Sequence, residues 1–162
     1  MRFHGLALLA GAVVLGACSG GANKADTTSA AAPAPAAAAP AANALAALPA
    51  TGATVDIKMV GDDKGYRFEP ANVTIKEGDA VRFTMVAGGP HNVSFDPTTV
   101  PADSKAQLDA NMPQKLSELS SPMLMNPNET YTISFAGVKP GVYPFHCTPH
   151  LAMNMKGTIT VQ

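Results

Sequence analysis

The sequence is short of charge, of cysteine and of long hydrophobic runs, and each shortage excludes a class of protein. Charged residues make up 14% of the chain and the formal net charge is −1, with no basic cluster. A nucleic-acid-binding face is therefore not expected. The longest apolar run, from Leu6 to Leu15, is too short to span a bilayer. With two cysteines in 162 residues, a disulfide-rich scaffold is also excluded.

The first residues are typical of an export signal. An arginine, an apolar run and small residues follow one another, which predicts a signal peptide over residues 1–17. The stretch Leu15-Gly16-Ala17-Cys18 resembles the lipobox of bacterial lipoproteins, in which the cysteine becomes the lipidated first residue. We therefore expect an exported protein whose lipid on Cys18 anchors it to a membrane; the alternative is a plain secretory signal that contains a cysteine.

The remaining chain divides into a linker and one domain. Residues 18–53 are rich in Ala, Pro, Gly, Ser and Thr and have too few large apolar residues to bury a core, which predicts a flexible linker after Cys18. Residues 54–162 have the composition of a globular domain. If Cys18 carries lipid, Cys147 is the one thiol left in that domain. A lone thiol in an oxidising compartment favours a metal ligand or a nucleophile over a core filler.

The domain is predicted to be all-β. Short β-branched and aromatic runs alternate with period two and are separated by turn residues, which indicates an antiparallel Greek-key β-sandwich or barrel of about eight strands. The predicted strands are Thr54–Val60, Tyr66–Glu69, Val73–Lys76, Ala80–Val86, His91–Phe95, Thr130–Ala136, Gly141–Cys147 and Gly157–Val161. A polar insertion over residues 97–128 is expected to hold one or two short helical turns around Ala106–Leu119.

Soft metal ligands gather near the C-terminus. Cys147 ends a predicted strand, His150 follows after a turn, and Met153 and Met155 precede the last strand. Strand alternation turns His146 to the opposite side from Cys147, so the two cannot easily share a metal. Met155 has the parity of the inward-facing residues of the next strand.

The missing second imidazole has one upstream candidate, His91. It follows Gly88-Gly89-Pro90, where small residues let the backbone approach another loop. Two histidines, one cysteine and a weak axial methionine form the blue-copper electron-transfer site. Three histidines in the domain are too few for the additional copper centres of multicopper oxidases or copper nitrite reductases.

Residues 54–162 also resemble the cupredoxin family of plastocyanin, amicyanin and pseudoazurin. The motifs that carry the resemblance are Pro90-His91-Asn92-Val93, Cys147-Thr148-Pro149-His150, Phe68-Glu69-Pro70, Val73-Thr74-Ile75 and Pro140-Gly141. The resemblance implies one copper ion held by His91, Cys147, His150 and Met155, with Met155 preferred over Met153. It also implies that Asn92, together with Thr148, links the His91 loop to the Cys147 loop.

The resemblance implies an electron carrier and not an enzyme, because four protein ligands leave no open coordination position. Its partners would be redox proteins such as a c-type cytochrome or a membrane redox complex, and the protein is expected to be a monomer. A docking patch of small or apolar residues is predicted at the metal-binding end: Gly89, Pro90, Leu151 and Met153.

Two other functions stay open at this point. An exported copper-handling protein, a chaperone or a store, would bind Cu(I) through Met-rich surfaces, and the runs Met123-Leu124-Met125 and Met153-Asn154-Met155 suggest such a surface. Zinc accepts Cys and His but rarely a thioether, so a zinc site fits less well.

Overall fold

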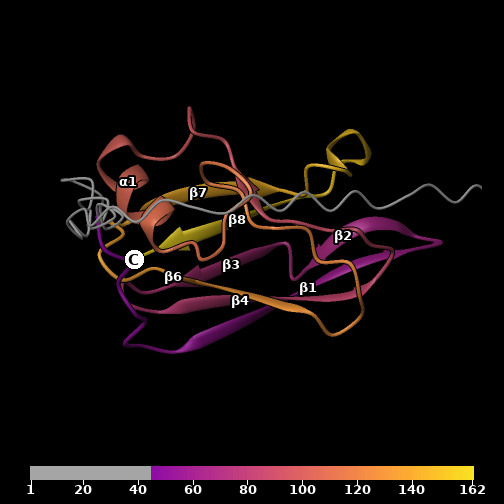
Figure 1. The fold of residues 1–162 in the computed structure, drawn as a ribbon, viewed down its shortest axis with the longest axis horizontal. Coiled ribbons are helices and arrows are strands. Elements are labelled where there is room, and N and C mark those ends of the chain that lie inside the picture. The colour runs from indigo at the N-terminus through magenta and orange to yellow at the C-terminus, as the bar shows by residue number, and fades with distance from the viewer. Residues whose placement is uncertain (1–44) are drawn as a thin grey trace, which may run out of the picture. The chain divides into compact units, whose positions relative to one another are not determined.

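A computed structural model describes residues 45–162, which form a β-sandwich of two four-stranded sheets (Figure 1). The strands in this part of the chain are β1 (Thr54–Asp62), β2 (Gly65–Glu69), β3 (Asn72–Ile75), β4 (Ala80–Ala87), β5 (Ser94–Phe95), β6 (Thr130–Ser134), β7 (Gly141–His146) and β8 (Lys156–Val161). One sheet has the order β2-β1-β4-β6 and the other β3-β8-β7-β5. The predicted all-β class with a short helix is therefore confirmed. The predicted signal peptide and the lipidated Cys18 lie outside the described residues.

The sequence pattern predicts antiparallel pairing, but two of the strand pairs are parallel. β1 pairs in parallel with β4, and β3 pairs in parallel with β8. The chain passes from one sheet to the other between these strands, because β1, β2 and β4 lie in one sheet and β3 in the other. Residue alternation within a strand fixes which face is buried, but not the direction of the neighbouring strand.

The core fills the space between the sheets with the apolar residues that period two predicts. In β4, Val81, Phe83 and Met85 are buried while Arg82 between them is exposed. Aromatic rings from both sheets meet edge to face in the centre: the centroids of Phe83 and Phe145 are 5.4 Å apart. Such burial supplies most of the stability of a sandwich of this size.

The insertion contains one helix, α1 (Ala102–Ala110), which starts and ends earlier than predicted. Pro101 stands immediately before it, where the missing N–H of proline does no harm. Pro113 cannot continue a helix and disfavours helical backbone at the residue before it. Beyond it, residues 116–121 lie along β5 and not in a helical turn.

Helix α1 and the C-terminus lie at one end of the sandwich, and the loop between β7 and β8 lies at the other (Figure 1). We call the first the helix end; it comprises α1, residues 45–53 and the turn 76–79. Asn111 accepts a hydrogen bond from the N–H of Leu48 at 2.8 Å and donates to the carbonyl oxygens of Ser134, the last residue of β6, and of Ala136. Residues 45–53, the end of the predicted linker, are in this way bound to the domain. Searched over the part of the chain that is described, no helix has the length and apolar character needed to cross a membrane.

Candidate metal centre

The cysteine of the site is presented by the end of β7. Tyr143, Phe145 and Cys147 alternate inward along this strand and are all buried. Immediately after it, the chain makes a short 3-10 helix at Leu151–Met153 and returns into β8. The loop is closed by two backbone bonds, from the Cys147 N–H to the Met155 oxygen at 3.0 Å and from the Met155 N–H to the His150 oxygen at 3.2 Å. His150 is thereby folded back toward the cysteine.

His91 is presented by a loop that needs its glycines. Gly88 has φ +76, a conformation that side chains disfavour, and a Cβ there would collide with the backbone of Gly61. Contrary to the prediction, His91 does not start a strand. It pairs with Leu124 in an isolated bridge ahead of β5. Its Nε2 lies 2.9 Å from the Ala87 oxygen. That contact places the proton on Nε2 and leaves the lone pair of Nδ1 free.

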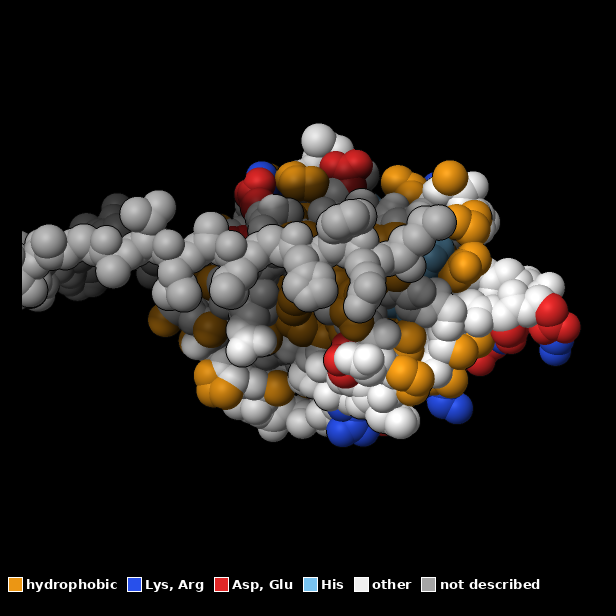
Figure 2. Space-filling model, turned by 45° about the vertical axis from the view of Figure 1, so that its right-hand side comes forward, with side chains coloured by type: hydrophobic (Ala, Val, Ile, Leu, Met, Phe, Trp, Pro, Cys, Tyr) orange, Lys and Arg blue, Asp and Glu red, His pale blue; other side chains and the backbone are white. Residues whose placement is uncertain are grey.

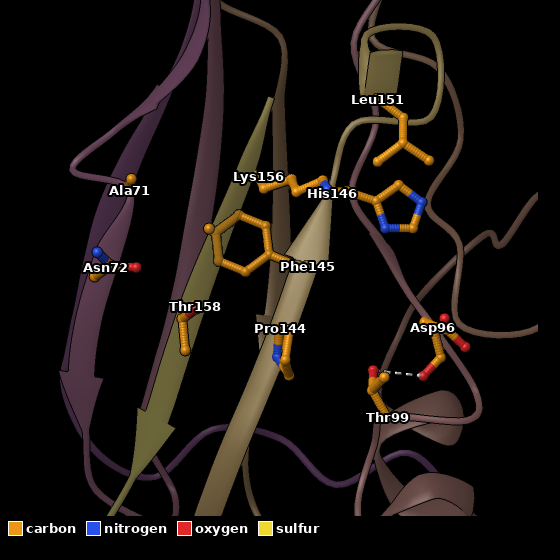
Figure 3. Close-up of a pocket in the computed structure, with 11 residues that line it drawn as sticks. Ala71, Asn72, Asp96, Thr99, Pro144, Phe145, His146, Leu151, Lys156 and Thr158 are labelled. Carbon is orange, nitrogen blue, oxygen red and sulfur yellow. Dashed lines mark hydrogen bonds between the residues drawn. The ribbon is translucent and has the colours of Figure 1, made fainter. Parts of the chain in front are cut away.

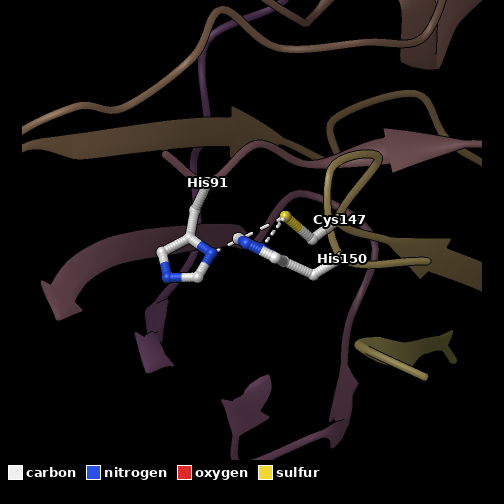
Figure 4. Close-up of side chains that lie close together, drawn as sticks. All are labelled: His91, Cys147 and His150. Carbon is white, nitrogen blue, oxygen red and sulfur yellow. Dashed lines mark hydrogen bonds between the residues drawn. The ribbon is translucent and has the colours of Figure 1, made fainter. Parts of the chain in front are cut away.

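The three side chains converge on one point (Figure 4). The Cys147 sulfur lies 3.6 Å from Nδ1 of His91 and 3.4 Å from Nδ1 of His150. The possible ligand atoms of the three residues all lie within 4.8 Å of one another. Within residues 45–162, no other group of three or more His, Cys, Asp or Glu side chains comes together in this way. All three residues are buried, with His150 the most accessible at 6% exposure. We call the loops around them the metal end.

The electrostatics of the site suit a metal ion. Burial lowers the pKa of His91, against the hydrogen bond to Ala87, and burial together with the charge of His91 lowers the pKa of His150. Both rings are therefore neutral near pH 7, the form that binds metal. Burial raises the pKa of the Cys147 thiol, although the backbone N–H groups of Asn92 and His150 oppose it. A bound cation would reverse that shift by stabilising the thiolate.

The donor set selects the kind of metal. One thiolate and two imidazoles without a carboxylate suit copper or zinc and exclude magnesium and calcium. The two candidate thioethers differ in position: Met155 is fully buried, whereas Met153 is 50% exposed in the 3-10 helix. A buried sulfur next to the cluster fits a weak axial ligand, and an exposed sulfur does not. This favours Met155 as the fourth ligand.

The predicted link between the two ligand loops is present in the structure. The side-chain oxygen of Asn92 accepts a hydrogen bond from the backbone N–H of Thr148 at 2.7 Å. The Asn92 amide nitrogen also approaches the Thr148 hydroxyl at 3.3 Å. Since Asn92 and Thr148 each adjoin a ligand, this bond fixes His91 and Cys147 relative to each other.

The sequence analysis missed an aromatic ring at the site. Tyr66 of β2 stacks on the His150 ring, with centroids 3.8 Å apart and planes at 14°. It also meets His91 edge to face at 6.1 Å. The parity of Tyr66 with the buried Phe68 was a usable signal, because both must point to the inner face. The stack restricts the orientation of the His150 ring.

The surface around the cluster is apolar. Gly89 and Pro90 are exposed, and Leu151 and Met153 are 42% and 50% exposed. Neither of these two large side chains folds inward to seal the site. Figure 2 shows a pale blue histidine surface among orange hydrophobic side chains at one end of the molecule.

His146 is not part of the cluster. Its ring points between Leu151 and Asp96, at one side of a hollow of about 530 Å³ over β7 and β8 (Figure 3). Burial and the charge of Lys156 lower the pKa of His146, while Asp96 opposes them. His146 therefore points away from Cys147 and the cluster, as strand alternation predicts.

Comparison with known proteins adds independent evidence. Residues 55–162 match the model of a family described as copper binding proteins, plastocyanin/azurin family. A plastocyanin of Prochlorothrix hollandica is 40% identical over 118 residues, which are 73% of this chain and 80% of that protein. A plastocyanin of Rumex obtusifolius is 37% identical over 108 residues, 67% of this chain and all of that protein. The oxidised plastocyanin structure from Dryopteris crassirhizoma is 33% identical, with a TM-score of 0.53, covering 67% of this chain and 100% of that one.

Proposed function

This chain belongs to the plastocyanin/azurin family of copper-binding proteins, and from that membership we propose that it carries single electrons between redox proteins outside the cytoplasm. It is a blue copper protein with one copper ion. The observation that carries the proposal is the buried cluster of one thiol and two imidazoles, both presenting Nδ1 to the sulfur. The described residues contain no second cluster of this kind that could serve a catalytic metal.

We assign the copper ligands to His91, Cys147, His150 and Met155. Bound copper supplies a one-electron couple, since a thiolate, two imidazoles and a weak thioether suit both of its oxidation states. The task of the protein is to keep the ligand atoms in nearly the same place in both states. The closed loop from Cys147 to Met155 and the bond from Asn92 to Thr148 support this role. With four protein ligands in a buried pocket, no position is left for a substrate, so we infer that the protein is not an enzyme.

Electrons would enter and leave through His150. This residue is the most accessible of the buried cluster, and the docking patch of Gly89, Pro90, Leu151 and Met153 surrounds it. An exposed apolar patch usually marks a contact surface. A partner such as a c-type cytochrome or a membrane redox complex, bound there, would come close to copper without opening the site. In this proposal the protein is an exported monomer anchored to a membrane by lipid on Cys18, after removal of residues 1–17.

A copper-handling role is the second candidate, because Met125 and Met153 are 59% and 50% exposed. The two functions differ in stoichiometry and colour. The electron carrier binds one copper ion per chain, absorbs intensely in the visible range when oxidised, and is reduced and reoxidised without losing metal. Additional Cu(I) ions on the methionines, or a colourless single site, would contradict the proposal; titration with copper and visible spectroscopy measure both.

The choice of Met155 as axial ligand has its own test. A thioether favours Cu(I) more than an amide oxygen does, so Met155→Gln should keep copper bound but lower the reduction potential. Met153→Gln is the matched control and should leave the potential unchanged, since Met153 is exposed. Voltammetry of the two variants decides, and a shift for Met153→Gln alone would assign the ligand to Met153.

A further inference from the structure

The Asn92 side chain is held by more than the bond to Thr148. Its amide nitrogen lies 3.1 Å from the Ser94 hydroxyl and 3.3 Å from the Ser120 hydroxyl. The Ser94 oxygen in turn lies 2.7 Å from that of Ser120 and 3.0 Å from that of Thr148. Three hydroxyls therefore surround one amide. Asn92, Ser94 and Ser120 are all buried, so removal of one hydroxyl leaves the Asn92 amide with one hydrogen-bond partner fewer.

Ser120 comes from the insertion over residues 97–128. Residues 116–121 lie along β5: Phe95 donates to the Leu119 oxygen at 3.0 Å, and Ser121 donates to the Val93 oxygen at 2.9 Å. Helix α1 holds the same segment, since the Asp109 carboxylate accepts from the Leu119 N–H at 2.8 Å. The insertion thus delivers a hydroxyl to the metal end from a rigid support.

The three hydroxyls hold the side-chain amide of Asn92. The side-chain oxygen of Asn92 accepts from the N–H of Thr148, the residue after Cys147, and the backbone N–H of Asn92 is one of the two groups that lower the pKa of the Cys147 thiol. A rotation of the Asn92 side-chain amide would release the N–H of Thr148 and loosen the link between the His91 loop and the Cys147 loop. An N–H near a thiolate reduces the electron density that the sulfur gives to copper, and this favours Cu(I).

We propose that Ser120, acting with Ser94, is a positioning residue of the copper site: its hydroxyl orients Asn92 and thereby couples the insertion to the reduction potential. The inference rests on the proposed function, because it takes Cys147 as a copper ligand. Ser120 touches neither copper nor any of the assigned ligands. Its effect passes through Asn92.

Ser120→Ala tests the proposal. The reduction potential should fall, the visible absorption band should shift, and copper should be lost to a chelator roughly 10-fold faster. In the copper-free protein, the side-chain amide hydrogens of Asn92 should exchange with solvent faster, as measured by NMR. Ser120→Thr keeps the hydroxyl and should restore all four properties, because Ser120 lines a hollow of about 350 Å³ that can take a methyl group.

Two further variants keep the test decisive. Ser117→Ala removes an exposed hydroxyl from the same segment and should match the wild type throughout. If Ser120→Ala does not fold, Ser94→Ala removes the hydroxyl between Ser120 and Thr148 and must lower the potential and speed amide exchange likewise. The proposal is overturned if the variant keeps the wild-type potential, band, copper retention and exchange rate, even with a lower melting temperature. A wild-type protein that binds no coloured copper would instead refute the proposed function.

Discussion

The two ends of the sandwich use their hydrogen bonds for different purposes. At the helix end, side chains bond to backbone groups: Asn111 to Leu48, Ser134 and Ala136, and Asp79 to Ala53 and to Lys76 in its own turn. At the metal end, the bonds to His91 and Asn92 fix these residues in place, and Nδ1 of His91 faces the Cys147 sulfur at 3.6 Å. The hydrogen bonds of the helix end attach chain segments to one another, whereas those of the metal end position the metal-ligating atoms.

A single strand separates them. The N–H of Ala80, at the start of β4, donates to the Ala53 oxygen at 2.8 Å, and the oxygen of Ala87, at its end, meets His91 at 2.9 Å. Eight residues of strand span about 25 Å. At that distance, changes at the two ends should act independently on stability and on the metal. Variants at each end can break or sharpen this separation.

The largest effect is expected at the metal end from Cys147→Ser. The intense visible absorption should disappear completely, because Cys147 is the thiol available for charge transfer to copper in the part of the chain described. The copper-free protein should keep its fold, since a serine hydroxyl is close in size to a thiol. Absorption spectra after copper loading measure the first point and circular dichroism the second. A variant that stays coloured would refute the assigned site.

At the helix end, Asn111→Ala should lower the free energy of unfolding by about 2–4 kcal/mol, because it leaves buried backbone groups without partners. Asn111 is 5% exposed and bonds to Leu48, Ser134 and Ala136. The copper spectrum should not change. Gln107→Ala is the milder control, since Gln107 is half-buried and bonds to Ala46 and Asn111. A change of colour in Asn111→Ala would show that the two ends are not independent.

A smaller effect is expected from a charge on the docking patch. Leu151→Glu should slow electron self-exchange between two copies of the protein roughly tenfold, because like charges then meet in the contact. The spectrum and the potential should stay as they are. Val142→Glu places the same charge on a residue that is 54% exposed near the start of β7, away from the patch, and should leave the rate unchanged. NMR line broadening in mixtures of oxidised and reduced protein gives the rate. Weakened copper retention in Leu151→Glu would contradict the assignment of Leu151 to the docking patch.

The smallest effect concerns pH at the helix end. Hydrogen bonds from the N–H groups of Lys76 and Ala53 lower the pKa of Asp79 from its ordinary value of 3.8. A lowered pKa in the folded state adds stability above pH 3.8, and this contribution is lost as the pH falls through the folded-state value. Asp79→Asn should therefore be less stable than the wild type at pH 7, with the difference shrinking below pH 4. Urea unfolding of the copper-free proteins measures it; a difference independent of pH would contradict the assignment.

The metal end was largely predictable from the sequence, and the helix end was not. Cys147 and His150 lie close together in the sequence, and strand alternation decided which neighbours face inward. His91 followed because few histidines were available. These inferences depend on the spacing of nearby residues and on the kinds of side chain that bind metals, and both can be seen in the sequence itself.

What the sequence could not indicate are contacts between distant segments. Tyr66 and His150, or Leu48 and Asn111, meet because whole strands and loops pack in a particular order. The same holds for Ser120, whose position depends on the pairing of the insertion with β5. Helix α1 was predicted too far along the chain for a local reason. Pro101 and Pro113 limit where a helix can begin and continue, and the predicted range did not follow them.

The parallel pairing of β1 with β4 has a mechanical consequence. Residues 45–53 lead directly into β1, which lies inside its sheet between β2 and β4. If the N-terminal part of the chain is held at a membrane while a partner grips the metal end, the pulling force runs along the axis of β1. Its hydrogen bonds to β4, in register from Thr54 to Met59, then carry the load together in shear and do not open one after another. An anchor on the N-terminal part of the chain would thus pull on a strand that can bear tension while a partner is bound.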